Sequence, residues 1–190
     1  MSDSENVSPA GVRIAMRETR ELIASPPPGI RLLPGDEVDV RAELTGPEGT
    51  PYEGGAFRLR LTLGPRFPTV APRASFETRV FHPNVSETGA VCVDTLSRGW
   101  SAALGLRHAL TAVRCLLIAP NADSALNAEA AALMRDHYEL YCERARLYTQ
   151  IHARPTECEA SIAKREAPSD DTDALRKKLH KEKKRVLKRL

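Results

Sequence analysis

The stretch that decides the fold is Phe81–Trp100, which reads FHPNVSETGAVCVDTLSRGW and carries neither a helical nor a strand period. Long irregular segments inside a compact domain are usually functional or disordered. Here enough apolar side chains are present to hold the segment against a core: Phe81, Val85, Val91, Val93, Leu96 and Trp100. The composition therefore favours an ordered, functional segment.

Upstream of it, the sequence predicts a helix followed by strands. Ser8-Pro9 offers an N-cap and a first-turn proline for a helix over residues 9–24, and the prolines that begin at Pro26 end it. Residues 38–44 and 57–63 alternate between apolar and polar, and turn-forming residues separate them, so they predict adjacent antiparallel strands. A shorter strand near Leu32 or over 74–76 would join them, which predicts a sheet of three or four strands.

Downstream, apolar periodicity predicts helices over residues 104–118, 124–134 and 138–151. Consecutive strands followed by helices indicate an α+β domain: an N-terminal helix, an antiparallel meander, an irregular segment, a central helix and two C-terminal helices. The pattern weakens after His152. We therefore expect a folded domain over residues 1–153, a linker over 154–173 and a basic tail over 174–190.

The charge is distributed unevenly along the chain. The net charge is +3, but the last 17 residues hold nine Lys or Arg against one acid, Glu182, so the tail carries +8 and the remainder −5. Such a tail suits an acidic partner, a phosphate backbone or a charged membrane. The sequence shows neither an apolar run of about 18 residues nor a signal peptide, so we expect a soluble intracellular protein.

The four cysteines show no CxxC pair, so we expect no metal site, and an intracellular setting predicts free thiols: Cys92, Cys115, Cys142 and Cys158. Cys115 and Cys142 lie in predicted helices and fit ordinary buried thiols. Cys92 lies in the irregular segment, where it is either another inert thiol or a nucleophile.

Two neighbours of Cys92 could support chemistry. His82 suggests the base of a Cys–His protease, although such pairs are recognised by geometry and not by proximity in sequence. The amide of Asn84 could donate a hydrogen bond to a developing oxyanion, or it could simply hold a turn.

The order of short motifs carries a resemblance over residues 10–152: Tyr52-Glu53-Gly54-Gly55, Phe67-Pro68 to Pro72, His82-Pro83-Asn84, Cys92, Trp100 and Pro120-Asn121. This order resembles that of ubiquitin-conjugating enzymes. The resemblance implies that Cys92 accepts ubiquitin as a thioester, that Asn84 is the oxyanion donor, and that His82 shapes the loop. It also implies a cis peptide bond before Pro72.

In such an enzyme ubiquitin arrives from an activating enzyme that consumes ATP, and an incoming lysine amine attacks the thioester. No bound cofactor or metal is needed. The amine must lose its proton, and Asp94 and Asp123 are candidate acceptors, whereas Ser124 stands where many members of the family carry an acid. The donor ubiquitin would lie on one helix, either at Leu106, Leu110 and Val113 or at their exposed neighbours Arg107, His108 and Arg114, and the same helix carries Cys115.

Further motifs resemble the S-type branch of the family: residues 24–30, 46–52, 104–108 and 115–118, and the basic tail that ends in Leu187-Lys188-Arg189-Leu190. That branch elongates ubiquitin chains with the anaphase-promoting complex, through the lysine at the eleventh position of ubiquitin. The resemblance implies that the last four residues dock on this multi-subunit ligase. A small residue, Thr69, stands where strong binders of RING domains often carry a large hydrophobe, so a tail anchor would be useful.

We expect a cytoplasmic and nuclear protein that binds neither membrane nor nucleic acid. Three alternatives stay open: an enzyme for another ubiquitin-like modifier, an inactive ubiquitin-binding variant, and a nucleic-acid protein. The tail alone suggests the last, and it has no aromatic residue between Ala174 and Leu190 to stack on bases.

Overall fold

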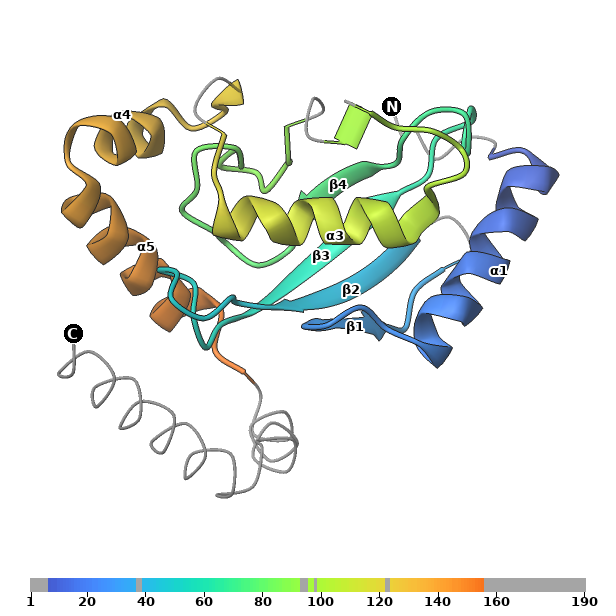
Figure 1. The fold of residues 1–190 in the computed structure, drawn as a ribbon, viewed down its shortest axis with the longest axis horizontal. Coiled ribbons are helices and arrows are strands. Elements are labelled where there is room, and N and C mark those ends of the chain that lie inside the picture. The colour runs from blue at the N-terminus through green and yellow to red at the C-terminus, as the bar shows by residue number, and fades with distance from the viewer. Residues whose placement is uncertain (1–6, 37–38, 93–95, 98, 122–123, 156–190) are drawn as a thin grey trace, which may run out of the picture. The chain divides into compact units, whose positions relative to one another are not determined.

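The computed structural model describes residues 7–36, 39–92, 96–97, 99–121 and 124–155 of the 190-residue chain. Its elements follow the order α1 (Pro9–Ala24), β1 (Ile30–Leu33), β2 (Asp39–Thr45), β3 (Ala56–Thr62), β4 (Arg73–Phe76), α3 (Gly105–Ile118), α4 (Ala128–Asp136) and α5 (Tyr138–His152). The predicted α+β fold is confirmed, with four strands and with both of the shorter strands present (Figure 1).

The sheet is an antiparallel meander in the order β1-β2-β3-β4. Ala42 lies opposite Leu59, and Leu59 lies opposite Phe76, so one face of the sheet is apolar from strand to strand. Helix α3 runs across the sheet (Figure 1), and its Leu110 and Leu117 belong to the same buried cluster as these strand residues. The core therefore lies between α3 and the sheet.

Helix α1 begins and ends where its sequence signals stand. The Ser8 hydroxyl accepts a hydrogen bond from the Gly11 N–H at 3.0 Å. A longer connection ties α1 to the central helix, because the Glu18 carboxylate accepts the Leu106 N–H at 2.7 Å. Gly105 has φ +64°, and a Cβ there would lie 2.6 Å from that carboxylate, so glycine is required at this position. Thus α1 caps the start of α3.

Two expectations were wrong. Helix α4 begins at Ala128 and not at Ser124, because the Asn127 side chain caps the helix by accepting the Ala130 N–H, and because the Leu126 and Asn127 N–H groups both donate to the Pro83 carbonyl. Among the residues that the structure describes, the cis peptide bond is Phe67–Pro68 and not the bond before Pro72. No helix within the described ranges is long and apolar enough to cross a membrane.

Candidate functional site

His82 is the buried centre of the irregular segment. Its side chain is fully buried, and its Nε2 lies 2.9 Å from the Leu116 carbonyl of α3. The Asn84 backbone N–H donates to its Nδ1 at 3.0 Å. The carbonyl can only accept and Nδ1 must accept, so the neutral tautomer with the proton on Nε2 satisfies both bonds. Both ring nitrogens are thus engaged, and neither is free to take a proton from a thiol.

Burial lowers the pKa of His82 to about 4, against a smaller opposing contribution from the hydrogen bond to the Leu116 carbonyl. A charged ring would also lose the bond from the Asn84 N–H. At neutral pH the ring is therefore uncharged and acts as a connector between α3 and the segment that contains Asn84.

This pKa predicts a pH-dependent stability. The folded state excludes a proton that the unfolded state binds below about pH 6.5, so the contribution is complete above that pH and is lost as the pH falls towards 4. Relative to His82→Gln, the wild type should lose about 3 kcal/mol of unfolding free energy between pH 6.5 and 4, at roughly 1.4 kcal/mol per pKa unit. Urea unfolding of both proteins over this range measures the difference. Parallel stability curves would contradict the prediction.

The Asn84 side chain is also buried, and it binds the segment that follows α3. Its amide nitrogen donates to the Asn121 carbonyl at 2.5 Å and to the Ser124 carbonyl at 2.9 Å. Its amide oxygen accepts the Asn121 N–H at 2.8 Å. Both amide hydrogens are therefore occupied. The role of oxyanion donor stays a prediction, and in this arrangement it requires one of the two donated bonds to be released.

A tight turn reverses the chain direction between Asn84 and Cys92 and places the two residues opposite each other. Val85 and Val91 form a bridge, and the Cys92 N–H donates to the Asn84 carbonyl at 3.1 Å. Gly89 makes the tight turn possible: it has φ +89°, and a Cβ there would lie 2.1 Å from the Phe76 carbonyl. This turn explains why a spacing of eight residues brings Asn84 and Cys92 together. Cys92 is half-buried, so it is partly accessible to solvent.

Residues 124–127 lie against the same loop. Besides the bond from Asn84 to the Ser124 carbonyl, the Pro83 carbonyl accepts the N–H groups of Leu126 and Asn127 at 2.8 and 2.9 Å. Ser124 is half-buried, and Leu126 is exposed beside it. The two predicted proton acceptors, Asp94 and Asp123, lie outside the described residues, as do Leu187, Lys188, Arg189 and Leu190.

Helix α3 divides the predicted ubiquitin-binding residues. Leu106, Leu110 and Val113 are fully buried and belong to the core, so a contact between α3 and donor ubiquitin would have to come from the exposed side of the helix. They face the sheet because they repeat at helical spacing on the apolar side of α3. The exposed side instead carries Arg107, Thr111, Cys115 and Ile118.

Two arginines of α3 contact the turn after α1. Arg107 Nη2 donates to the Ser25 carbonyl at 2.6 Å. The half-buried Arg114 guanidinium lies against Gly29, where a Cβ would come 2.8 Å from Arg114 Nε. Both side chains therefore stabilise the proline-rich turn. His108, which follows Arg107 in the sequence, is half-buried.

The other described cysteines differ in exposure. Cys142 is buried, as expected for an ordinary thiol, whereas Cys115 is exposed, so its predicted burial was wrong. Position 115 follows Thr111 by four residues on the outer side of α3, which places it in solvent. Cys158 lies outside the described residues. Within the described part of the chain, no three His, Cys, Asp or Glu side chains form a group that could hold a metal ion.

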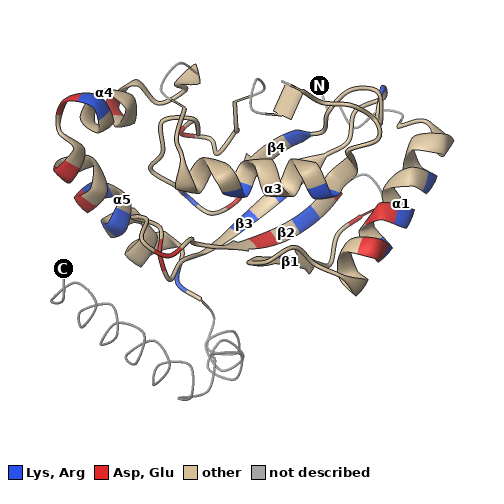
Figure 2. Cartoon of the chain, viewed as in Figure 1, with Lys and Arg blue, Asp and Glu red and all other residues tan. Residues whose placement is uncertain are grey.

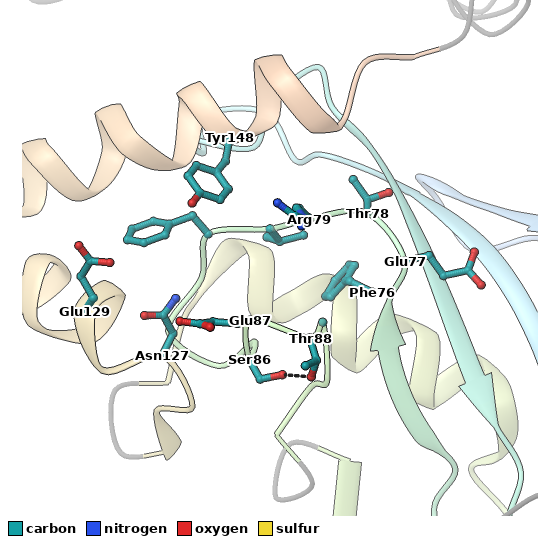
Figure 3. Close-up of a pocket in the computed structure, with 13 residues that line it drawn as sticks. Phe76, Glu77, Thr78, Arg79, Ser86, Glu87, Thr88, Asn127, Glu129 and Tyr148 are labelled. Atoms are coloured by element: carbon teal, nitrogen blue, oxygen red, sulfur yellow. Dashed lines mark hydrogen bonds between the residues drawn. The ribbon is translucent and has the colours of Figure 1, made fainter. Parts of the chain in front are cut away.

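A hollow of about 470 Å³ lies on another part of the surface (Figure 3). Its lining comes from the end of β4, the loop after it, the turn at 86–89, the start of α4 and Tyr148 of α5. Arg79 and Glu87 are among the side chains around it, and neither Cys92 nor Asn84 lines it. The Cys92 thiol therefore lies outside this hollow.

Sequence reasoning missed a buried tyrosine pair that binds the start of the irregular segment at Phe81. The Tyr52 hydroxyl donates to the Phe81 carbonyl at 2.8 Å and lies 2.8 Å from the Tyr141 hydroxyl. Since the carbonyl takes the Tyr52 proton, Tyr141 is the donor between the two hydroxyls. Burial raises the pKa of Tyr52 well above its usual range and that of Tyr141 to about 12. Two tyrosines 89 positions apart give no sequence signal for such a pair.

Trp100 closes the segment at its other end. The indole Nε1–H donates to the Pro68 carbonyl at 3.0 Å, which joins the end of the irregular segment to the loop between β3 and β4. The segment is thus fastened at Phe81, at His82 and at Trp100, and Cys92 lies between these points.

Comparison with known proteins identifies relatives of this fold. A family model described as ubiquitin-conjugating enzyme matches residues 14–149. The protein named ubiquitin-conjugating enzyme E2 S from Drosophila ananassae is 45% identical over 204 aligned positions, which cover 100% of this chain and 98% of the relative. The protein of the same name from Drosophila yakuba is 44% identical, with the same coverage.

Among solved structures, one from Plasmodium yoelii that carries the name ubiquitin conjugating enzyme superposes with a TM-score of 0.71 at 32% sequence identity. The match covers 78% of this chain and 98% of that structure. The likeness to the solved structure therefore leaves a part of this chain uncovered, whereas the likeness to the two Drosophila sequences extends over all of it.

Proposed function

The chain belongs to the ubiquitin-conjugating enzyme family, and from that premise we propose that Cys92 is the residue that carries ubiquitin as a thioester. Enzymes of this family transfer ubiquitin through a cysteine thioester and act between an activating enzyme and a ubiquitin ligase. The observation that carries the assignment is the half-buried Cys92 thiol on a loop fixed by the bond from the Cys92 N–H to the Asn84 carbonyl. Of the other described cysteines, Cys142 is buried and Cys115 lies within a helix.

The transfer proceeds in two exchanges of the same acyl group. The Cys92 thiolate attacks the thioester that the activating enzyme presents, and the thiolate of that enzyme leaves. A neutral lysine amine then attacks the new thioester carbonyl, a C–N bond forms, and the C–S bond to Cys92 breaks. The lysine must first give up its proton, to Asp94, to Asp123 or to a group on the acceptor. No bound cofactor is needed, and ATP is consumed upstream.

Asn84 and His82 keep the reacting loop in one geometry. His82 connects it to α3, and the Asn84 amide connects it to Asn121 and Ser124. A fixed loop matters because a thioester must meet the incoming amine at a defined distance and angle, and pre-organised geometry supplies much of the rate. We assign Asn84 this positioning role, with donation to the oxyanion as a second role during the reaction.

Within the family, the enzyme elongates ubiquitin chains. Support comes from the two E2 S relatives, whose similarity extends over the whole of this chain and so includes the basic tail. The tail ends in Leu187-Lys188-Arg189-Leu190, which would anchor the enzyme to a multi-subunit ligase such as the anaphase-promoting complex. Tethering raises the effective concentration of the enzyme near the growing chain, so a weak contact at exposed Thr69 would suffice. We expect linkage through the eleventh-position lysine of ubiquitin and a cytoplasmic and nuclear location.

Loading by different activating enzymes tests the choice of modifier. The full chain is incubated with ATP and with ubiquitin or another ubiquitin-like protein, each with its own activating enzyme. A thiol-sensitive adduct is expected with ubiquitin, at least tenfold above any other modifier. An adduct with another modifier alone would make this an enzyme for that modifier, and no adduct at all would favour an inactive binding variant.

A further inference from the structure

Lysine and arginine are divided sharply along this chain. The sequence from Met1 to Ala163 contains 17 arginines and no lysine, whereas residues 164–190 contain four arginines and all seven lysines: Lys164, Lys177, Lys178, Lys181, Lys183, Lys184 and Lys188. Every basic residue coloured blue in Figure 2 is therefore an arginine. A general preference for arginine does not explain the division, because the tail of the same chain uses lysine at most of its basic positions.

Some of these arginines make contacts that need a guanidinium. Arg60 places Nε and Nη2 within 3.1 and 2.9 Å of Glu77 Oε1. The Arg144 guanidinium lies over the Phe81 ring, 4.9 Å from its centroid. A lysine offers neither the planar fork nor the same stacking surface, so arginine is favoured by structure at such positions.

Other arginines make no contact that requires a guanidinium. Arg13, Arg17 and Arg20 are exposed on α1, and the ion pair from Arg17 to Glu21 spans 3.8 Å with 69% of the Arg17 side chain exposed. The Arg135 side chain is 70% exposed. Lysine and arginine have nearly equal helix propensity, and exposed ion pairs of this kind contribute little to stability. Neither the fold nor its stability requires arginine at these sites.

The chemistry of the proposed function does separate the two residues. A lysine amine that loses its proton can attack the thioester carbonyl, forming a C–N bond while the C–S bond breaks and the Cys92 thiolate leaves. A guanidinium stays protonated and is no such nucleophile. A lysine on the body that could reach Cys92 would compete at an effective concentration on the order of millimolar, because it would be attached to the thioester it attacks.

We propose, resting on Cys92 as the thioester residue, that arginine replaces lysine throughout residues 1–163 so that no side-chain amine of the folded domain can attack the thioester. Self-transfer onto lysine is thereby confined to residues 164–188. Residues 1–163 protect the thioester until an external acceptor arrives, and the segment from Lys164 onward is the one in which the enzyme can modify itself.

The test introduces an amine beside the site. Ala125 is exposed and follows Ser124, whose carbonyl accepts a hydrogen bond from the Asn84 side chain. The backbone carbonyl of the same Asn84 accepts the Cys92 N–H. In the 190-residue chain with all seven lysines of residues 164–190 changed to arginine, Ala125→Lys is compared with Ala125→Arg, which has the same charge and similar length but no reactive amine. Each protein is loaded with lysine-free ubiquitin, activating enzyme and ATP, without ligase. Thiol-resistant adduct is measured relative to thiol-sensitive adduct.

The parent chain is expected to form thiol-resistant adduct only on the lysines of residues 164–190, located by peptide mass spectrometry. The lysine-free background should form at least tenfold less of it. Ala125→Lys should restore the adduct at least tenfold above Ala125→Arg. Equal, low levels for both Ala125 variants would overturn the proposal, since an available amine would then make no difference. Absence of thiol-sensitive adduct from every sample, parent included, would instead mean that the proposed thioester function fails.

Discussion

Replacing Asn84 by alanine is expected to lower ubiquitin transfer by about 100-fold and the unfolding free energy by about 3 kcal/mol at the same time. The variant removes three hydrogen bonds that join the loop of Cys92 to Asn121 and Ser124. Two carbonyls and one N–H then lose their partners in a part-buried setting, and the loop loses its fixed geometry. Urea unfolding and single-turnover discharge of the thioester to free lysine measure the two effects.

The joint loss separates the two roles of Asn84. A residue that acted only as an oxyanion donor would slow discharge and leave stability within about 0.5 kcal/mol of the wild type. Asn84→Asp is the matched control, because it keeps an acceptor for the Asn121 N–H but places a carboxylate against two carbonyls. It should be at least as unstable as the alanine variant. A stable Asn84→Ala protein with slow discharge would contradict the positioning role.

Deleting Lys188–Leu190 is expected to reduce ligase-stimulated chain growth by at least tenfold while Cys92 still accepts ubiquitin. Loss of the tether removes the gain in effective concentration, which reaches several orders of magnitude for linked sites. Chain growth is followed with the anaphase-promoting complex and a ubiquitinated acceptor, and loading is followed separately with the activating enzyme alone.

A matched control separates the end of the chain from its charge. The double variant Lys183→Ser and Lys184→Ser removes two positive charges, as the deletion does, but leaves the terminal residues in place. It should retain most of the stimulated chain growth. If it fails as badly as the deletion, the tail acts through charge alone; if loading falls together with chain growth, the tail supports charging or folding.

The sheet was predictable from sequence because alternation with a period of two leaves a clear signal. Phe57, Leu59 and Leu61 alternate with Arg58 and Arg60, and the three apolar side chains are buried in the core. The start of α4 was not predictable, because it depends on the Pro83 carbonyl, some 40 positions away, which holds Leu126 and Asn127 in a non-helical conformation. Tertiary hydrogen bonds decide such boundaries.

The candidate site was predictable in part. The spacing of Asn84 and Cys92 pointed to the site, and the turn at Gly89 supplies the reason for it. The sequence left open which side of α3 faces the sheet, because apolar residues occupy most of the circumference of the helix. The side-chain bonds of Asn84 to Asn121 and Ser124 depend on the packing of distant segments, which no local pattern encodes.

The chemistry of the bond to ubiquitin tests the central assignment most directly. Wild type, Cys92→Ser and Cys92→Ala are each loaded with activating enzyme, ATP and ubiquitin, and the adducts are treated with thiol or with mild alkali. The wild-type adduct should be cleaved by thiol, the Cys92→Ser adduct should resist thiol but yield to alkali because an oxygen ester replaces the thioester, and Cys92→Ala should form none. A thiol-sensitive ubiquitin adduct that persists in Cys92→Ala would show that another cysteine carries ubiquitin.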